Sequence, residues 1–331
     1  MFYSIVIPVY NRKDELIAIC DSLSKQTLKS FEIIVVDDGS IDSAEPVCLD
    51  FKDKLTIKYI YKYNSGPGLS RNVGADQAKG DYIIFLDSDC IVPSQYLESL
   101  DKFLLEHKNI DAFGGPDACE DSANDKQKAI NYAMTSFFTT GGIRGGGKKR
   151  LDSFIPRSFN MGVSRKLWSL TNGFSSMRFG EDMEFSYRII ESGFSTALIQ
   201  DAYVYHMRRT DVKAFFKQVF FSGMARINLY KRFPRTLKLV HILPAFFALY
   251  ILLLFPLILF FGKIIMLPIF AVVIIWFLDS LRLYRSVNIS LMSVESSFIQ
   301  IFAYGLGFLY CFWQRMICQK DEDSSYNTDF Y

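Results

Sequence analysis

The sequence has no large excess of charge of either sign. Its 331 residues include 37 lysines and arginines and 35 aspartates and glutamates, which gives a formal net charge of +2. Binding to nucleic acid usually relies on a strongly basic surface, so the composition gives no general argument for a nucleic-acid partner. Hydrophobicity, by contrast, is unevenly distributed. Apolar runs are short up to about Lys238 and long beyond it, which indicates one large domain followed by an apolar appendage.

The sequence also lacks the cysteine patterns of disulfide scaffolds and structural metal sites. Its six cysteines form no Cys-x-x-Cys pair and no other metal-ligand spacing. We therefore expect reduced, mostly buried thiols in a cytosolic environment. No basic segment precedes the short apolar run that ends at Pro8, so no secretory signal is visible. We expect the N-terminus to remain in the cytosol.

Short apolar runs alternate with amphipathic segments in the first third of the chain. Strands are expected at residues 4–9, 31–36, 55–61 and 82–86, and helices after Asn11 and at residues 69–78. This alternation predicts an α/β fold with a mostly parallel sheet and helices on both faces. Polar residues follow the carboxyl ends of the strands, which is where open α/β sheets bind ligands.

The middle of the chain is less regular. Residues 139–149 are rich in glycine and cationic side chains, and this composition is typical of a mobile loop. Further helices are expected near residues 165–171 and 183–191. A strand is expected at residues 197–204, just before His206.

Two long apolar runs follow at residues 239–261 and 264–278, separated only by Gly262 and Lys263. The first is long enough to cross a bilayer, and the pair predicts a transmembrane hairpin. Pro244, Pro256 and Pro268 lie in or near these runs, so kinks are expected. A third apolar run, residues 298–313, is short, and we expect it to lie in the membrane interface. The expected organisation is a large α/β domain at 1–235, the hairpin at 236–285 and an interfacial or third spanning helix with a polar tail at 286–331.

Basic residues flank the hairpin at both of its ends. They are Lys231, Arg232, Arg235 and Lys238 before it and Arg282 and Arg285 after it, whereas the turn carries only Lys263. The positive-inside rule then places the large domain on the cytosolic side of the membrane. The same cations are suited to anionic lipid headgroups.

Several carboxylates stand where they could perform chemistry. Asp87 and Asp89 follow an apolar strand one residue apart, and paired hard oxygen ligands suit Mg²⁺ or Mn²⁺. Asp37 and Asp38 end another strand, where a carboxylate can accept hydrogen bonds from a base or ribose. An ordinary Asx-type turn explains that pair equally well. Tyr10 could stack on a base, although a core aromatic would look the same in sequence.

A second group of candidates lies further along the chain. Glu181 and Asp182 stand at an expected helix start, where a carboxylate can act as a general base or simply cap the helix. His206 follows a strand and could be a third metal ligand. A lone histidine is, however, more often structural.

The motif segments IVIPVYNR, VVDDGS, GLSRNVGADQAKGDYIIFLDSD, FNMGVSR and GEDMEFSYRIIESGF follow one another at plausible intervals. Each is a modest signal alone. As an ordered set, they closely resemble the family 2 glycosyltransferases with a GT-A fold, over roughly residues 3–206. The resemblance implies a Rossmann-like catalytic domain with a mostly parallel sheet, which transfers a sugar from a nucleotide-sugar.

The resemblance also implies roles on the donor side of the site. Pro8, Tyr10 and Asp38 match positions that hold the nucleotide base, with Asp37 beside them. Arg71 matches a basic residue near the nucleotide. The expected donor is a UDP-sugar, with a GDP-sugar as the other option.

At the reacting end, Asp87 matches the first aspartate of the D-x-D motif, near the ribose and diphosphate, and Asp89 matches its metal ligand. Asp182 matches the catalytic base, with Glu181 beside it at the acceptor. His206 resembles a metal-ligating histidine of some members. The implied cofactor is Mg²⁺ or Mn²⁺.

The sequence departs from the processive branch of the family, which carries a QxxRW motif after the catalytic base. The nearest candidate here, which begins at Gln218, lacks the Arg-Trp. We therefore expect a non-processive transfer, and the resemblance implies inversion at the anomeric carbon. The expected acceptor is a saccharide, in particular a lipid-linked one used in cell-surface polysaccharide synthesis. The expected location is the cytoplasmic membrane. Two alternatives stay open: a sugar nucleotidyltransferase, although PVYNR is not the glycine-rich loop that such an enzyme needs, and a non-catalytic membrane scaffold.

Overall fold

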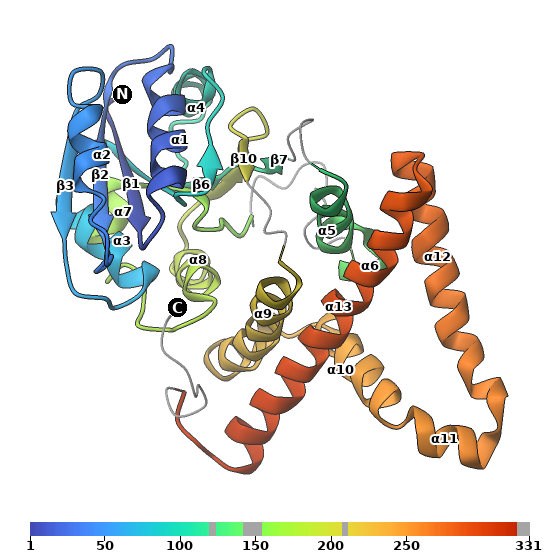
Figure 1. The fold of residues 1–331 in the computed structure, drawn as a ribbon. Coiled ribbons are helices and arrows are strands. Elements are labelled where there is room, and N and C mark those ends of the chain that lie inside the picture. The colour runs from blue at the N-terminus through green and yellow to red at the C-terminus, as the bar shows by residue number, and fades with distance from the viewer. Residues whose placement is uncertain (119–123, 142–153, 207–210, 323–331) are drawn as a thin grey trace. The chain divides into compact units, whose positions relative to one another are not determined.

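The computed structural model describes residues 1–118, 124–141, 154–206 and 211–322. The chain forms two compact units. The sheet unit contains the described residues of 1–120 and 148–207, and the helical unit contains those of 121–147 and 208–327. Figure 1 draws both as ribbons. These bounds differ from the expected division at residues 235 and 285, which stays a prediction about domains.

A seven-stranded sheet with the order β3-β2-β1-β4-β8-β6-β9 organises the sheet unit. The strands are β1 (Tyr3–Val9), β2 (Phe31–Asp37), β3 (Ile57–Tyr61), β4 (Tyr82–Leu86), β6 (Ala112–Gly114), β8 (Asn160–Ser164) and β9 (Thr196–Leu198). All neighbours pair in parallel except β8, which runs antiparallel to β4 and β6. The predicted mostly parallel sheet is confirmed.

Helices pack on this sheet as the alternating pattern predicts. They are α1 (Lys13–Ser24), α2 (Glu45–Asp50), α3 (Pro67–Asp76), α4 (Tyr96–Glu106), α7 (Arg165–Leu170) and α8 (Glu181–Glu191). Helices α2 and α4 and strands β6 and β8 were not anticipated, and α8 begins two residues before its expected start. The expected strand at 197–204 is wrong over most of its length, because β9 ends at Leu198. A second, three-stranded sheet has the order β5-β10-β7, formed by β5 (Cys90–Ile91), β7 (Asp117–Ala118) and β10 (Val204–His206).

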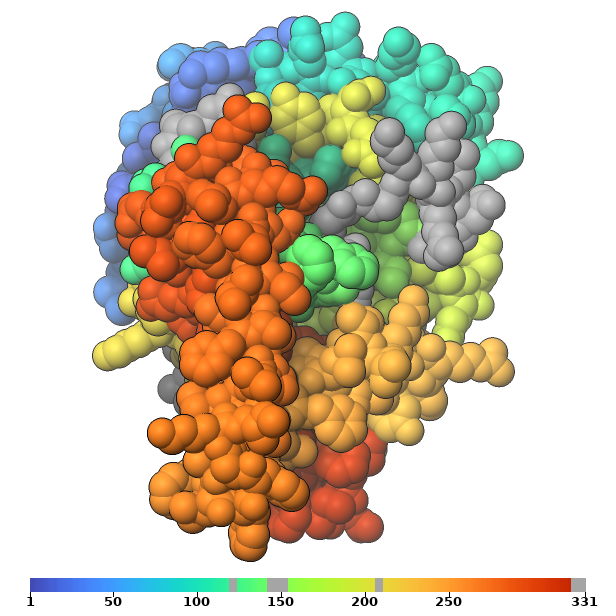
Figure 2. All heavy atoms as spheres, turned by 90° about the vertical axis from the view of Figure 1, so that its right-hand side faces the viewer, coloured from blue at the N-terminus to red at the C-terminus, as the bar shows by residue number. Residues whose placement is uncertain are grey.

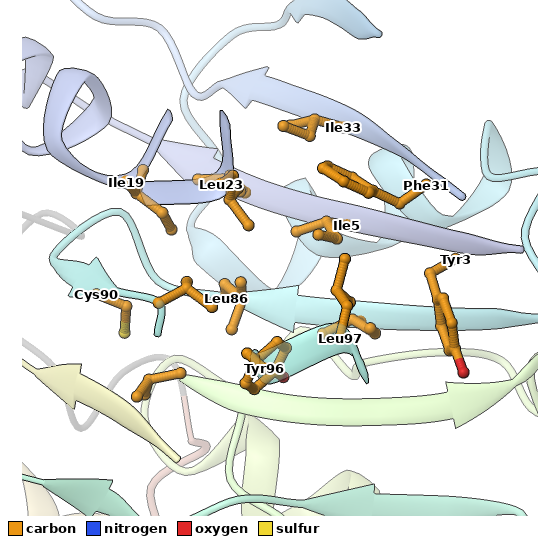
Figure 3. Close-up of a cluster of buried hydrophobic side chains, with 14 of the residues drawn as sticks. Tyr3, Ile5, Ile19, Leu23, Phe31, Ile33, Leu86, Cys90, Tyr96 and Leu97 are labelled. Carbon is orange, nitrogen blue, oxygen red and sulfur yellow. The ribbon is translucent and has the colours of Figure 1, made fainter. Parts of the chain in front are cut away.

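Both faces of the central strands are buried, which explains why their sequences are apolar without alternation. On one face, side chains of β1, β2 and β4 pack against α1 and α4. Figure 3 shows part of this cluster, with Ile5, Leu23, Leu86 and Leu97 pointing toward one another. All four are completely buried. The core therefore lies on strands whose carboxyl ends carry the candidate residues.

The helical unit consists of seven helices among the residues that the structure describes. They are α5 (Asp125–Thr135), α6 (Phe137–Thr140), α9 (Val212–Arg232), α10 (Leu239–Leu252), α11 (Leu254–Phe261), α12 (Leu267–Tyr284) and α13 (Val287–Phe312), with short helical turns at 234–236, 263–266 and 313–317. Helix α13 contacts α5, α9, α10 and α12. Thr139 and Thr140 belong to α6, so the expected loop at 139–149 is wrong at its start. Residues 142–149 lie outside the described part.

The apolar run at residues 239–261 is not one continuous helix. The run is broken at Leu253, where α10 and α11 meet at an angle of 65°. Pro256 supplies the cause, because it has no N–H to donate to the carbonyl of Leu252 and its ring clashes with that carbonyl. The predicted kink is therefore present, and it is large enough to divide the run.

Two helical segments are long and apolar enough to cross a membrane, and a third qualifies if the bent pair α10 and α11 counts as one span. The two are Lys263–Tyr284 and Val287–Ile317. The second contradicts the view of residues 298–313 as a short separate element, because that run is the C-terminal half of α13. Shortness is thus no reason to place it in the membrane interface.

Glycines allow α13 to pack unusually close to its neighbours. A Cβ atom on Gly307 would lie 1.9 Å from the carbonyl oxygen of Phe220 in α9, and one on Gly305 would lie 2.1 Å from that of Pro244 in α10. Both distances are far below van der Waals contact with backbone atoms that have little freedom to move. Backbone contact at these glycines therefore sets the spacing of the three helices.

Replacing Gly307 with alanine is expected to destabilise the helical unit by about 1–3 kcal/mol, the usual cost of overpacking. Thermal unfolding of the detergent-solubilised chain, followed by circular dichroism, measures the effect. Val287→Ala, at a position 58% exposed on the same helix, is the control. Equal melting temperatures for the Gly307 variant and the wild type would contradict the packing argument.

Candidate active site

The candidate residues of the sheet unit gather at the carboxyl ends of β1, β2 and β4 and at the N-terminus of α8. Pro8 is in β1 and pairs with Val36 of β2, and half-buried Tyr10 follows that strand. Asp38 is hydrogen-bonded through its backbone N–H to the carbonyl of Val9. These contacts place the DDG turn beside the end of β1, as the parallel sheet predicts.

Asp37 is completely buried, and its carboxylate organises the loop that follows β2. Its Oδ1 accepts from the backbone N–H of Ser40 at 2.8 Å, and its Oδ2 accepts from the N–H of Ala44 at 3.0 Å and the hydroxyl of Tyr59 at 2.9 Å. Burial alone would raise the pKa of Asp37, but these hydrogen bonds outweigh it and keep the pKa below its usual value. The carboxylate is therefore committed to the fold.

Asp38 is also buried, and it anchors the loop that enters α3. Its Oδ1 accepts from the N–H of Ser65 at 3.0 Å and its Oδ2 from the N–H of Gly66 at 2.9 Å. Lys62 forms an ion pair with the same carboxylate. Gly66 has a φ of 94°, a conformation that favours glycine, and Pro67 then opens α3. Asp38 thus fixes the position of α3 and of Arg71 on it.

Arg71 connects two of the predicted motifs. Its side chain is only 3% exposed, and its Nη2 lies 2.6 Å from Oδ1 of Asp87 while its Nη1 lies 3.0 Å from Oε1 of Glu181. The guanidinium also lies 5.6 Å from the centre of the Phe174 ring. Burial lowers the pKa of Arg71, but the two carboxylates outweigh this and raise it above its usual value. Arg71 is therefore a permanent cation between the D-x-D turn and α8.

The two D-x-D carboxylates are partly exposed. Asp87 follows β4 directly, its carbonyl accepts from the N–H of Cys90 at 3.1 Å, and the side chain of Ser88 turns away to donate to Glu15. Asp87 and Asp89 are both intermediate in burial, although Oδ1 of Asp89 is itself buried. Two hard oxygen donors are what Mg²⁺ or Mn²⁺ requires when phosphates and water complete its coordination.

The backbone brings His206 close to this turn in the small sheet. His206 of β10 is the register partner of Cys90 of β5, the residue after Asp89. The side chain of His206 lies outside the described residues. Within the described part of the chain, no group of three histidine, cysteine, aspartate or glutamate side chains is arranged to hold a metal ion. The ligand role of His206 therefore stays a prediction.

Glu181 and Asp182 open α8 after Gly180, which adopts a left-handed conformation with φ 84°. Acidic residues in a first turn are favoured by the helix dipole. Asp182 Oδ2 lies 2.6 Å from Nε of Arg157, and its Oδ1 accepts from the N–H of Met183. Both carboxylates are buried and adjacent, but their ion-pair partners differ, and their pKa values shift in opposite directions.

The pKa of Glu181 is raised to about 7, first by burial and then by the charge of Asp182. Burial also acts to raise the pKa of Asp182, but the charge of Arg157 outweighs it and keeps the pKa below its usual value. At neutral pH Asp182 is therefore ionised while Glu181 is partly protonated. Asp182 alone is fully available as a proton acceptor.

Arg157 is a site residue that the sequence did not indicate. It lies ahead of β8 in a segment without a motif, and its partner Asp182 is 25 residues away. Its side chain is 36% exposed, so the ion pair is reached by solvent. Only the antiparallel insertion of β8 between β4 and β6 brings this segment to the start of α8.

Replacing Glu181 with glutamine is expected to stabilise the protein at pH 8 but not at pH 5. The native pKa of Glu181 is about 7, against an ordinary value of 4.5. The folded state therefore binds more protons than the unfolded state between these values, and stability falls as pH rises through them. Removing this carboxyl group should raise the free energy of unfolding by roughly 1–3 kcal/mol at pH 8. Melting temperatures of the wild type and the variant at both pH values test this, with the exposed Glu191→Gln as control. The same difference in melting temperature at pH 5 and pH 8 would contradict the raised pKa.

Comparison with known proteins identifies the family of the chain. The family model described as "Glycosyl transferase family 2" matches residues 4–169, which is half of the chain. The chain belongs to glycosyl transferase family 2. The predicted family and the predicted enzyme class are confirmed at that level.

Three curated relatives match over part of their length. A glycosyltransferase of Rickettsia felis is 37% identical over 136 residues, or 41% of this chain and 22% of that protein. GlyA of Streptococcus pneumoniae is 37% identical over 106 residues (32% and 15%). The poly(ribitol-phosphate) beta-N-acetylglucosaminyltransferase TarS of Staphylococcus aureus is 33% identical over 111 residues (32% and 19%). The matched segment thus spans less than a quarter of each relative.

Solved structures show the same fold. The mannosyltransferase PcManGT from Pyrobaculum calidifontis, in complex with GDP-Man and Mn²⁺, has a TM-score of 0.61 at 13% identity, over 95% of this chain and 87% of that one. S. aureus TarS 1–349 has a TM-score of 0.50 at 22% identity, over 67% and 64%. These similarities confirm the predicted GT-A fold.

Proposed function

We propose that this protein transfers a sugar from a nucleotide-sugar to an acceptor hydroxyl, with inversion at the anomeric carbon. The observation that carries the proposal is the buried Arg71, which holds Asp87 of the D-x-D turn and Glu181 of α8 on one guanidinium. Donor-side and acceptor-side residues that are 94 positions apart in the chain thereby form one site.

In the proposed reaction, Asp182 accepts the proton of the acceptor hydroxyl. The oxygen attacks the anomeric carbon on the face opposite the leaving group, and the bond to the nucleoside diphosphate breaks with its electron pair on the diphosphate. Arg157 keeps Asp182 ionised before the acceptor arrives. A single displacement of this kind inverts the configuration.

Pro8 and Tyr10 are proposed to border the nucleotide base. Asp37 and Asp38 have internal partners, so their proposed contribution is to shape the loops around the base. Asp87 and Asp89, with His206 as a further ligand, are proposed to hold Mg²⁺ or Mn²⁺, which would neutralise charge on the leaving diphosphate. PcManGT with GDP-Man and Mn²⁺, and TarS with UDP-GlcNAc, support both a nucleotide-sugar donor and a metal.

The acceptor is proposed to be a saccharide, plausibly lipid-linked, at the cytosolic face of the cytoplasmic membrane. The apolar helices of the helical unit and the basic residues at the base of α10 and α12 support this location. A role in the synthesis of a cell-surface polysaccharide would follow from such an acceptor.

Release of free nucleoside diphosphate tests the proposal. The purified full chain is incubated with Mn²⁺ and single donors, namely UDP-GlcNAc, UDP-glucose, UDP-galactose and GDP-mannose, with and without extracted membrane lipids. We expect acceptor-dependent release with one donor class. Pyrophosphate release would indicate a nucleotidyltransferase, and no release with any donor would favour a non-catalytic scaffold. NMR of the anomeric proton in the product would then show whether configuration is inverted.

A further inference from the structure

An extended apolar surface covers α10, α11 and α12. Large side chains along these helices are more than half exposed, among them Leu243, Phe246, Phe255, Leu259, Phe260, Phe270 and Leu278. Figure 2 shows the side chains of α12, in orange, at the surface along the helix. A surface of this extent is far larger than the patches that soluble monomers expose, so it marks a contact with lipid or another apolar partner.

Helix α6 marks one end of this surface. A Cβ atom on Gly141, just after α6, would lie 2.4 Å from Cγ2 of Val240 in the first turn of α10. The carbonyl of Phe138 accepts from Nε1 of Trp276 in α12 at 3.2 Å. The start of α10 and the middle of α12 therefore both lie next to α6, at the same level. Beyond this level, toward α11, the only cation is Lys263.

Cations gather immediately on the other side of that level. Arg235 and Lys238 precede α10, and Arg282 and Arg285 lie at the end of α12; all four are exposed. Only Arg282 has a carboxylate partner, Asp279 at 2.9 Å. Among the residues that the structure describes, Arg235, Lys238 and Arg285 form no ion pair. We call these four residues the cationic collar.

Aromatic and polar groups complete the boundary. Phe137 and Phe138 of α6 are 70% and 49% exposed at the same level. Asp279 accepts hydrogen bonds from Tyr132 and Ser136 there. A sequence of apolar side chains, then aromatic rings, then exposed cations matches the order of hydrocarbon, interface and phosphate across one leaflet.

We propose that the cationic collar binds the phosphate headgroups of anionic glycerophospholipids in the leaflet from which α10–α12 insert. An acidic protein or nucleic acid would need a basic surface that is separate from exposed hydrocarbon side chains. Here the cations and the apolar surface are continuous within one unit, so a bilayer satisfies both. Each cation near an anionic leaflet contributes about fivefold in affinity.

The test uses the purified full chain in neutral-detergent micelles and measures the melting temperature as lipid is added. Phosphatidylglycerol should stabilise the protein more than phosphatidylcholine at the same mole fraction, by mass action on the folded state. The advantage should shrink as salt rises. The double variants Arg235→Gln/Lys238→Gln and Arg282→Gln/Arg285→Gln should each require more phosphatidylglycerol for the same effect, roughly 25-fold more if each cation contributes as expected.

Three controls keep the proposal falsifiable. Lys52→Gln/Lys54→Gln removes two exposed cations from the sheet unit and should leave the lipid response unchanged. Arg235→Lys/Arg282→Lys keeps the charges and should retain the response. Melting temperatures of all variants without lipid establish that they fold. Equal stabilisation by both lipids, an unchanged response in the glutamine variants, or equal stabilisation by free inorganic phosphate would each overturn the proposal. The readout needs no catalysis, so it is independent of the proposed transferase activity.

Discussion

Replacing Asp182 with asparagine is expected to lower turnover by roughly 10²- to 10⁴-fold, the range for a lost general base, while donor affinity changes little. Asparagine keeps the size of the side chain and can still accept a hydrogen bond from Arg157, but it cannot accept the proton of the acceptor hydroxyl. Steady-state kinetics of nucleoside diphosphate release, with donor affinity measured separately by thermal shift, would separate the two effects.

A second variant distinguishes a base from a residue that only supports the fold. Replacing Arg157 with glutamine removes the charge that lies 2.6 Å from Asp182 and keeps its pKa low. The acidic limb of the pH–rate profile should then move to higher pH, because Asp182 would ionise later. Exposed Glu191→Gln on the same helix is the control for both variants. A collapse of donor affinity with turnover preserved in Asp182→Asn would instead make Asp182 a donor ligand.

Local sequence patterns were sufficient to predict the first four strands of the main sheet, β1 to β4, and the residues that follow them. A short uninterrupted apolar run such as Tyr82 to Leu86 is typical of a strand buried on both faces, and polar residues after such a strand are expected at the edge of the sheet. This is why Asp87 and Asp89 could be placed without coordinates. The order of motifs then added the family, and with it the fold.

Contacts between distant segments could not be predicted in the same way. Arg71 and Glu181 are 110 residues apart, and their ion pair depends on how α3 and α8 approach the end of β4. Nor could the direction of a side chain at the end of a strand be predicted. The sequence alone did not reveal that the Asp37 carboxylate points inward and accepts hydrogen bonds from Ser40, Ala44 and Tyr59. Such choices follow from the burial of whole loops, which no short pattern encodes.

The apolar C-terminal region shows a third limit. Hydropathy correctly identified the runs, because composition alone determines whether a helix can enter lipid. The prolines predicted a kink in the first run, but neither they nor hydropathy predicted that it would reach 65° at Leu253. Nor did hydropathy show that residues 298–313 continue a helix from Val287. Helix continuity depends on individual backbone hydrogen bonds and on packing against α5 and α9, both of which are invisible to a hydropathy window.

Replacing Asp89 with asparagine is expected to abolish transfer while leaving the fold intact. The side chain follows β4 in a turn held by the backbone bond from Cys90 to Asp87, so an isosteric change should not disturb the strand. The substitution removes one negative charge from a pair of hard oxygen ligands. Because Mg²⁺ or Mn²⁺ would be held here by few protein ligands, its affinity for the site would depend strongly on each of them. Asp81→Asn is the matched control, because it makes the same substitution at the opposite end of β4, where the carboxylate accepts only from the N–H of Phe2.

The measurement compares nucleoside diphosphate release by the wild type, Asp89→Asn and Asp81→Asn across a titration of Mn²⁺. Asp81→Asn should match the wild type at every concentration. Asp89→Asn should be inactive at low Mn²⁺, and any activity that excess metal restores would indicate weakened metal binding rather than a damaged site. Wild-type activity should disappear in EDTA and return with Mn²⁺ or Mg²⁺. Full activity of Asp89→Asn, or undiminished wild-type activity in EDTA, would exclude the proposed metal role.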